Sequence, residues 1–312
     1  MIDVIDCGYT MPRYAAAYLI VRNGRAAFVD NNTAHAVPRM LETLQAQGLN
    51  PEDVDYCIIT HVHLDHAGGS SALMKACPNA TLVAHPRAAR HAIDPSKLVS
   101  SASEVYGDAR FRELYGVIEP IDEERVRTME DDETLRFADR TLRFLHTRGH
   151  ANHHFVILVE EDEVIFTGDA FGLCYPDLCA EGLFAFPSTS PTDFDGPLAR
   201  EAVQRIVDTG AKTAYLTHFG GVTDLHAASA QLIGHLNVSE RLMEEAFASD
   251  LPDDQLESYI APLLQAHFEQ ALSGRAVAKQ PETWARLKMD LDLNAQGLAF
   301  VAAKKRRKAT TS

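Results

Sequence analysis

The chain contains the stretch His61-Val62-His63-Leu64-Asp65-His66, which places three imidazoles and one carboxylate at adjacent or alternating positions. Imidazole nitrogens and carboxylate oxygens are the side-chain ligands that bind Zn²⁺ and related first-row metals. A solvated polar loop rarely collects four such groups in so short a space. The stretch therefore predicts a metal site.

The residues around this stretch indicate where in a fold it lies. An apolar, β-rich run, Tyr56-Cys57-Ile58-Ile59-Thr60, comes before it, and Ala67-Gly68-Gly69 opens a helix-like segment that extends to about Cys77. Proteins of the α/β class build their sites at the carboxyl ends of strands, before a helix. We therefore expect an α/β fold with the metal ligands at one edge of a sheet.

Length and composition are those of an ordinary globular protein. The 312 residues are enough for one large domain with an appendage, and 46% of them are hydrophobic. No apolar run approaches the length of a membrane helix, and Met1-Ile2-Asp3-Val4-Ile5-Asp6 lacks the features of a secretory signal. Five scattered cysteines argue against a disulfide framework. We expect a cytoplasmic protein that does not interact with membranes.

The charge of the chain bears on its partners. A formal net charge of −15 disfavours nucleic acid as a partner, because binding to phosphates needs a basic surface. One basic run, Lys304-Lys305-Arg306-Arg307-Lys308, stands against that balance. We interpret residues 304–312 as a disordered basic tail. A small-molecule substrate is the expected partner.

The pattern along the chain predicts a large domain and a helical appendage. Residues 1–221 alternate between strands and helices, with a mostly helical insertion at 95–133 that is either a lid or peripheral packing. Residues 222–303 read as purely helical, with an apolar stripe on the segment 253–273. Either the parent domain covers that stripe or the helices form a homodimer interface.

Three further metal-ligand candidates follow later strands. His150 comes after the strand that includes Phe144 and Leu145, and Asp169 and His218 each follow another predicted strand. A glycine precedes two of these residues, so the backbone can turn tightly there. Donors from several strands can therefore join those of residues 61–66.

In these motifs the chain resembles the metallo-β-lactamase superfamily. The matching pieces are Thr60 to Gly69, Gly149-His150, Thr167-Gly168-Asp169 and Thr217-His218, in the order of the family. The resemblance implies an αββα sandwich with a site for two divalent metal ions, zinc first and iron or manganese as alternatives. It places His61, His63 and His150 on one metal, Asp65, His66 and His218 on the other, and Asp169 between them.

The resemblance also implies a hydrolase. A hydroxide that bridges the two metals is the expected nucleophile, because metal coordination lowers the pKa of bound water towards ~7. Asp65 is the expected catalytic residue that orients the hydroxide and carries its proton. Thioesters, esters and lactones are the favoured substrates, and a small-molecule phosphodiester is an alternative.

Two related groups of enzymes offer other interpretations. The helical end of the chain is similar in architecture to hydroxyacylglutathione hydrolases (glyoxalase II), but Phe219-Gly220-Gly221 follows His218 where those enzymes usually have a Glu-Tyr pair. Persulfide dioxygenases share the sandwich but use one iron held by two His and one Asp. The full second set of ligands favours hydrolysis, and His63 disfavours the flavodiiron proteins, which have Glu there.

The remaining candidates surround the ligands. Asp30 ends a predicted strand and His154 follows His150, so each is a candidate to support a ligand imidazole from behind. Aromatic residues next to the ligands or in the insertion are the candidates for an apolar substrate pocket. These are Phe171, Tyr175, Phe186, Phe219, Tyr106 and Tyr115.

Overall fold

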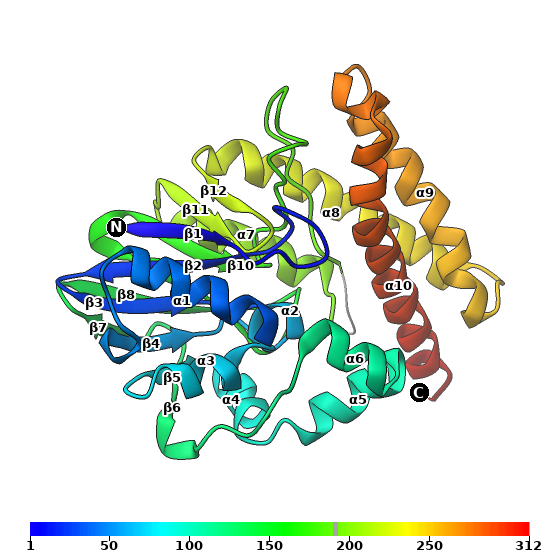
Figure 1. Cartoon of the computed structure of the whole chain (residues 1–312). Helices are drawn as coiled ribbons and strands as arrows, with labels where there is room; N and C mark the ends of the chain where they lie inside the picture. Colours follow the sequence, from blue (N-terminus) through cyan, green and yellow to red (C-terminus); the bar gives the residue numbers. More distant parts are fainter. Residues whose placement is uncertain (190–192, 312) are drawn as a thin grey trace. The chain divides into compact units, whose positions relative to one another are not determined.

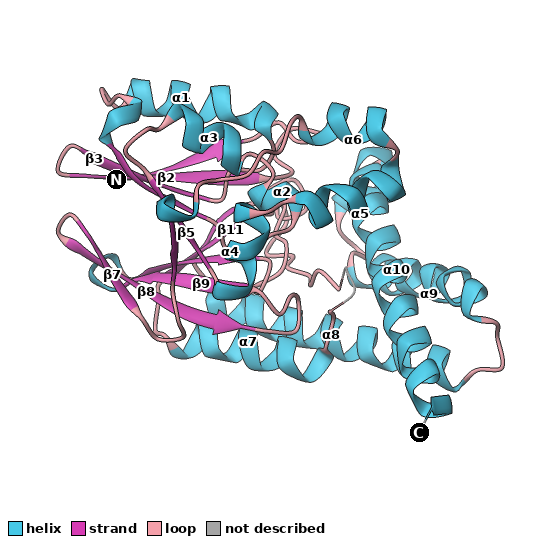
Figure 2. Cartoon of the chain, turned by 90° about the horizontal axis from the view of Figure 1, so that it is seen from below, coloured by secondary structure: helices cyan, strands magenta, loops and turns pink. Residues whose placement is uncertain are grey.

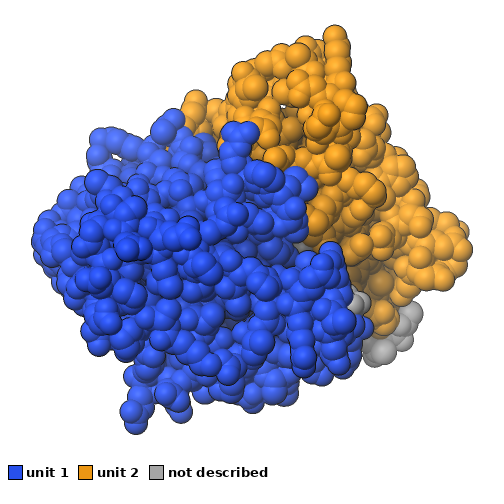
Figure 3. All heavy atoms as spheres, in the orientation of Figure 1, with its two compact units in different colours: residues 1–146, 153–168, 209–223 blue, residues 147–152, 169–208, 224–312 orange. Residues whose placement is uncertain are grey.

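The computed structural model describes residues 1–189 and 193–311. The chain divides into two compact units, which Figure 3 shows in blue and orange. Unit 1 comprises residues 1–146, 153–168 and 209–223. Unit 2 comprises residues 147–152, 169–208 and 224–312. The division therefore differs from the predicted boundary near residue 221, since two segments of the first part belong to unit 2.

Two six-stranded sheets form the framework of unit 1. The first has the strand order β1-β2-β3-β4-β5-β6, and the second has the order β12-β11-β10-β9-β8-β7. The first sheet consists of β1 (Ile2–Asp6), β2 (Ala16–Arg22), β3 (Arg25–Val29), β4 (Val54–Ile58), β5 (Thr81–Ala84) and β6 (Val126–Thr128). The second consists of β7 (Thr134–Phe137), β8 (Arg140–Thr147), β9 (His154–Val159), β10 (Val164–Gly168), β11 (Thr213–Leu216) and β12 (Gly220–Val222).

The pairing of the strands determines which residues meet at the site. Asn23 and Gly24 make the tight turn between β2 and β3, both with positive φ, as such a hairpin requires. The strands β3, β4 and β5 then run parallel, so their carboxyl ends lie at one edge of the sheet. In the second sheet β10 and β11 are also parallel. The segments after these strands carry Asp30, Thr60 and Thr217.

Unit 1 has two hydrophobic cores, and Figure 2 shows the layers that enclose them. One core lies between the first sheet and the helices α1 (Val37–Ala46), α3 (Ser70–Ala76) and α4 (Pro86–Ile93), and includes Phe28, Met40 and Leu73. The other lies between the sheets and includes Tyr18 and Phe155. Buried side chains alternate between the cores along β2, which is the period expected of a strand covered on both faces.

The insertion at 95–133 is only partly helical. It contains α5 (Ser96–Tyr106) and α6 (Asp108–Tyr115), and Phe111 packs against Tyr115 there. Towards its end the chain forms β6, which pairs in parallel with β5. This strand was not predicted, because a run of three residues has too little periodicity to be recognised.

Unit 2 is helical, with α7 (Gly196–Asp208), α8 (Leu225–Ala248), α9 (Leu256–Ala271) and α10 (Pro281–Thr311). Figure 1 shows α9 and α10 side by side, and α8 contacts both. The apolar stripe of α9 is covered within the chain, since Leu256, Ile260, Leu264 and Phe268 are all buried. Among the described residues, no helix has the length and apolar character needed to cross a membrane.

The basic run near the carboxyl end is helical, which differs from the prediction. We expected residues 304–312 to be a disordered tail, but α10 continues to Thr311. Arg306 explains this order, because its guanidinium donates hydrogen bonds to the carbonyls of Ala246, Phe247, Ser249 and Leu251. Carbonyls at the end of a helix have no partner inside that helix, so Arg306 supplies the donors that the end of α8 lacks.

Candidate metal centre

The histidine-rich stretch lies between β4 and the short helix α2 (Leu64–Ala67), at the edge where β3, β4 and β5 end. His61 and His63 lie in the segment that enters the helix, and Asp65 and His66 lie within it. The Nε2 atom of His61 is 2.7 Å from the Nδ1 atom of His63. The two nitrogens therefore face each other, close enough for one ion to be bound by both.

Asp65, His66 and His218 form a second group of donors within unit 1. The Oδ2 atom of Asp65 is 3.3 Å from Nε2 of His218 and 3.7 Å from Nε2 of His66. One ligand atom from each of the three residues lies within 4.8 Å of the others, the spacing that a single metal ion can bridge. His66 and His218 are buried, while the Asp65 side chain is 28% exposed.

Hydrogen bonds determine which nitrogen of each imidazole carries the proton. Nδ1 of His66 lies 2.9 Å from the carboxylate of Asp30, and Nδ1 of His218 lies 2.9 Å from the backbone carbonyl of Tyr14. A carboxylate and a carbonyl can only accept, so Nδ1–H donates in both cases. Nε2 of each ring therefore keeps its lone pair, which is the tautomer that binds a metal.

The carboxylate of Asp30 connects several of these residues through hydrogen bonds. It accepts hydrogen bonds from the Thr60 amide at 2.8 Å, the Thr60 hydroxyl at 3.0 Å and the Thr217 hydroxyl at 2.7 Å, besides that from His66. The residue is 1% exposed, and its φ of 54° turns the chain sharply at the end of β3. The four donors replace the water that a buried carboxylate loses. Asp30 therefore holds the imidazole of His66, a predicted ligand, in one orientation.

Two more histidines surround His61. The ring of His154 lies 4.8 Å from that of His61, and the ring of His153 stacks on it at 6.1 Å. Gly168 is needed for this packing, because a Cβ there would lie 2.6 Å from both Nε2 of His154 and Oγ1 of Thr60. His154 was a predicted support for the site, whereas His153 was not among the predicted site residues.

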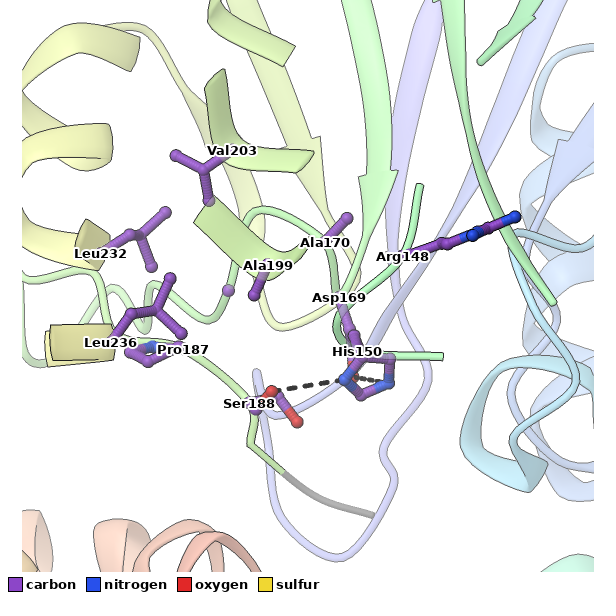
Figure 4. Close-up of a pocket in the computed structure, with 11 residues that line it drawn as sticks. Arg148, His150, Asp169, Ala170, Pro187, Ser188, Ala199, Val203, Leu232 and Leu236 are labelled. Carbon is purple, nitrogen blue, oxygen red and sulfur yellow. Dashed lines mark hydrogen bonds and ion pairs between the residues drawn. The ribbon is translucent and has the colours of Figure 1, made fainter. Parts of the chain in front are cut away.

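The other two predicted ligands, His150 and Asp169, lie together in unit 2. Nε2 of His150 is 3.4 Å from Oδ2 of Asp169, and Nδ1 of His150 bonds the Ser188 carbonyl at 3.4 Å (Figure 4). The carbonyl accepts the Nδ1 proton, so Nε2 of His150 keeps its lone pair, as in His66 and His218. Gly149 permits the turn before His150, because a Cβ there would lie 2.1 Å from the amide nitrogen of Ala199.

Figure 4 also shows that His150 and Asp169 stand at the edge of a pocket in unit 2. Most of its wall is apolar, while Arg148 and Ser188 add polar groups near His150. The empty space amounts to about 290 Å³, including the part open to solvent. Its lining residues are Arg148, His150, Asp169, Ala170, Gly172, Pro187, Ser188, Ala199, Val203, Leu232 and Leu236.

The predicted aromatic pocket needs correction. Phe171, Tyr175 and Phe186 are fully buried and do not line the pocket of unit 2. They belong to the core of that unit, where the Tyr175 hydroxyl donates to Asp290 and Phe186 packs against Phe268. Large apolar side chains close to a site in sequence can thus serve packing instead of binding.

The other aromatic candidates lie in unit 1. Phe219 packs against the core between the sheets, and Tyr115 is buried against Phe111. The side chain of Tyr106 lies outside the described residues. Four residues of the insertion, Leu98, Ile118, Glu119 and Ile121, line a second pocket together with apolar residues in and around the histidine stretch. The insertion therefore contributes to a cavity of unit 1.

Three groups that position the predicted ligands, directly or through Asp30, were missed from sequence: the Tyr14 carbonyl and the side chains of Thr60 and Thr217. The carbonyl of Tyr14 could not be predicted from sequence. Every residue has a backbone carbonyl, and the partner of this one, His218, is 204 positions away. The two threonines immediately precede ligand histidines, and that position is the signal that could have identified them. His85 follows the strand β5. Its Nδ1 caps the start of α4, and its ring contacts that of His146.

Comparison with known proteins identifies the family. A model of the metallo-β-lactamase superfamily matches residues 10–218. A metallo-β-lactamase fold-containing protein of Sulfurisphaera tokodaii is 29% identical over 175 residues, which cover 55% of this chain and 63% of that protein. An atrochrysone carboxyl ACP thioesterase of Pseudocercospora fijiensis is 26% identical over 182 residues, which cover 58% of this chain and 39% of that protein. The chain thus spans less than two thirds of either relative.

Solved structures agree in fold over nearly the whole chain. A metallo-β-lactamase family protein of Thermus thermophilus has a TM-score of 0.64 at 21% identity and covers 99% of this chain and 94% of its own. An archaeal metallo-β-lactamase superfamily protein of Sulfolobus tokodaii has a TM-score of 0.63 at 21% identity. The match covers 95% of this chain and 97% of that protein. The α/β fold predicted from the motifs, with its helical carboxyl-terminal region, is confirmed. The chain belongs to the metallo-β-lactamase superfamily, whose members typically bind divalent metals and are mostly metallo-hydrolases.

Proposed function

We propose that this chain is a binuclear metal-dependent hydrolase in which water attacks the carbonyl carbon of a thioester, ester or lactone and the acyl C–S or C–O bond breaks. One observation supports this most strongly. His66, His218 and His150 each have Nδ1 bonded to an acceptor and Nε2 turned towards a carboxylate, Asp65 or Asp169. Histidines that serve only packing need no such arrangement, whereas metal ligands almost always show it.

The donor set fits two divalent ions. We assign His61, His63 and His150 to one ion, Asp65, His66 and His218 to the other, and Asp169 to a position between them. Neutral imidazoles and two carboxylates suit zinc, and iron or manganese are the alternatives. When bound, such ions lower the pKa of a coordinated water and polarise a substrate carbonyl.

The side chains of the chain have separate tasks in this proposal. Asp65 is the only one of the second group with a partly exposed side chain, so its carboxylate is placed to orient the attacking water and to hold the proton that it loses. Asp30 keeps His66 in one orientation and one tautomer through the 2.9 Å bond. The carbonyl of Tyr14 does the same for His218.

Two observations favour an acyl substrate. The pocket beside His150 and Asp169 has an apolar wall that includes Val203, Leu232 and Leu236, which suits a hydrocarbon group next to the carbonyl. One relative is named an acyl carrier protein thioesterase. A thiolate leaves without being protonated, so a thioester places the smallest demand on the groups described here.

The test is a substrate panel combined with metal analysis. The purified chain, loaded with zinc, iron or manganese in separate samples, is given thioesters, lactones, carboxylic esters and phosphodiesters, together with a persulfide in an oxygen electrode. Hydrolysis of one of the acyl classes with two ions per chain supports the proposal. Phosphodiester hydrolysis alone, or oxygen consumption on the persulfide with one iron per chain, would overturn it.

The variant Asp169→Ala tests the bridging assignment. It should lose bound metal and acyl hydrolysis together, because the carboxylate is assigned to both ions. The matched control is Asp193→Ala, which removes a carboxylate from the same unit whose described contact is the Asn152 amide at 3.4 Å. Full metal content with full activity in Asp169→Ala would contradict the assignment.

A further inference from the structure

Two cysteines that the proposed hydrolase does not use lie against each other in unit 2. The Sγ atoms of Cys174 and Cys179 are 3.2 Å apart. Cys174 is 6% exposed, whereas Cys179 is partly exposed. Cys179 is therefore the more accessible residue of the pair for a small molecule in solution. A disulfide needs the sulfurs at about 2.05 Å, so they need to approach by little more than about 1 Å.

The chain between the cysteines is held in a tight turn. The Cys179 amide donates to the carbonyls of Tyr175 and Pro176, both at 3.2 Å, and the Gly182 amide donates to the Cys179 carbonyl at 3.1 Å. These bonds fix the backbone on which the two cysteines stand. The turn therefore keeps Cys174 and Cys179 close together, and the rotation of each side chain sets the remaining distance between the sulfurs.

Arg275 fixes this turn from the end of α9. Its guanidinium donates to the carbonyls of Gly182 at 2.9 Å and Leu183 at 3.1 Å, and it lies over the ring of Phe184 at 5.5 Å. The positive charge therefore lies next to the segment that contains Cys179. Reactive cysteines are found in such electropositive, partly exposed surroundings.

We propose that Cys174 and Cys179 are a redox-active dithiol that closes to an intrachain disulfide with a low-molecular-weight disulfide as oxidant. The Cys179 thiolate attacks one sulfur of the oxidant, forms a mixed disulfide and releases the first thiolate. Cys174 then loses its proton and attacks Sγ of Cys179, which releases the second thiolate. The protein loses two electrons, and the small disulfide is reduced to two thiols.

The electrostatics assign the two roles. The S–H of Cys174, which donates to the neighbouring sulfur, lowers the pKa of Cys179 to about 7, and Arg275 acts in the same direction. The same hydrogen bond, together with burial, raises the pKa of Cys174. Cys179 therefore loses its proton more readily than an ordinary cysteine, and more readily than Cys174. Cys179 is the attacking residue, and Cys174 is the resolving one.

The experiment uses the full-length chain in mixtures of oxidised and reduced glutathione, followed by acid quenching, alkylation of free thiols and mass spectrometry. Trypsin leaves both cysteines in the peptide Gly149–Arg200, and cleavage before Asp177 separates them. In oxidising mixtures the wild-type peptide should lose the mass of two hydrogen atoms and take no alkyl label. The two fragments from cleavage at Asp177 should then stay linked.

Variants distinguish this reaction from general thiol oxidation. Cys174→Ser should accumulate glutathione on Cys179, and Cys179→Ser should react at Cys174 roughly tenfold more slowly. The control is Cys57→Ser, which removes a fully buried cysteine of unit 1 and should leave the disulfide unchanged. Alkyl label on both cysteines of the wild type in fully oxidised glutathione would overturn the proposal, as would equal glutathione on the two single variants.

Discussion

Replacing Asp30 with asparagine tests the arrangement of the ligands most sharply. The backbone amide of Thr60 must donate to Oδ1 of Asp30, and Nδ1–H of His66 donates to Oδ2. Asparagine offers one oxygen and one NH₂ group, so it can serve only one of these two donors. If the oxygen stays with Thr60, the NH₂ group faces His66 and moves the ring proton to Nε2, where it blocks the metal.

The expected loss of zinc affinity or stability in Asp30→Asn depends on which hydrogen bond of the carboxylate is lost. Changes to groups that orient a ligand histidine typically reduce metal affinity roughly 10–100-fold, which is about 1.4–2.8 kcal/mol. If the asparagine turns the other way, the buried Thr60 amide loses its acceptor, at a cost of about 1–3 kcal/mol in the free energy of unfolding. Asp30→Asn should therefore lose zinc affinity, folding stability or part of both.

Competition titration of the metal-free chain with a chromophoric chelator measures the affinity, and urea unfolding measures the stability. The matched control is Asp290→Asn, which changes a carboxylate that is 5% exposed and accepts from Tyr175 in unit 2. That control should lose stability and keep its zinc affinity. Wild-type values for both quantities in Asp30→Asn would refute the idea that Asp30 sets the tautomer of His66.

Three further perturbations act on packing and stability. Gly168→Ala puts a Cβ 2.6 Å from His154 and Thr60 at a φ of +49°, so urea unfolding should show a loss of about 3 kcal/mol, whereas Gly234→Ala, with open space around its Cβ, should gain up to about 1 kcal/mol. Arg306→Gln should lose about 2 kcal/mol because the carbonyls after α8 lose their donors; a loss under about 0.5 kcal/mol would contradict that role. Burial, and then His267, lower the pKa of His235 to about 4. Between that pH and about 6.5 the unfolded chain binds a proton at residue 235 that the folded chain does not. The contribution of His235 to stability should therefore fall by about 2 kcal/mol from about pH 7 to 5, and His235→Gln should remove this part of the pH dependence.

Much of the fold could be predicted from local patterns. The dipeptide Asn23-Gly24 favours a tight turn and so predicts the hairpin β2–β3, and the helical pattern after residue 222 agrees with the helix α8. The strand β12 was not predicted, because Gly220 and Gly221 have low strand propensity and pair only through the neighbouring β11. Tertiary contacts override the local signal there.

The candidate site was predictable to the extent that each residue carries its own chemistry. His61 to His66, His150, Asp169 and His218 are recognisable because imidazoles and carboxylates are metal ligands, and four of them stand within six residues. The aromatic residues Phe171, Tyr175 and Phe186 were assigned wrongly, since an apolar ring suits a core as well as a pocket. The order of the helix end at Arg306 was also missed, because its acceptors lie 55 to 60 positions away in the chain.

The number of metal ions bound per chain distinguishes a two-metal site from a one-metal site. The metal-free chain is titrated with zinc and the bound equivalents are counted, in the wild type and in His218→Ala. We predict two equivalents in the wild type, from two sets of ligands, and one in the variant, because His218 belongs to only one set. A single equivalent in the wild type, unchanged by His218→Ala, would contradict this account.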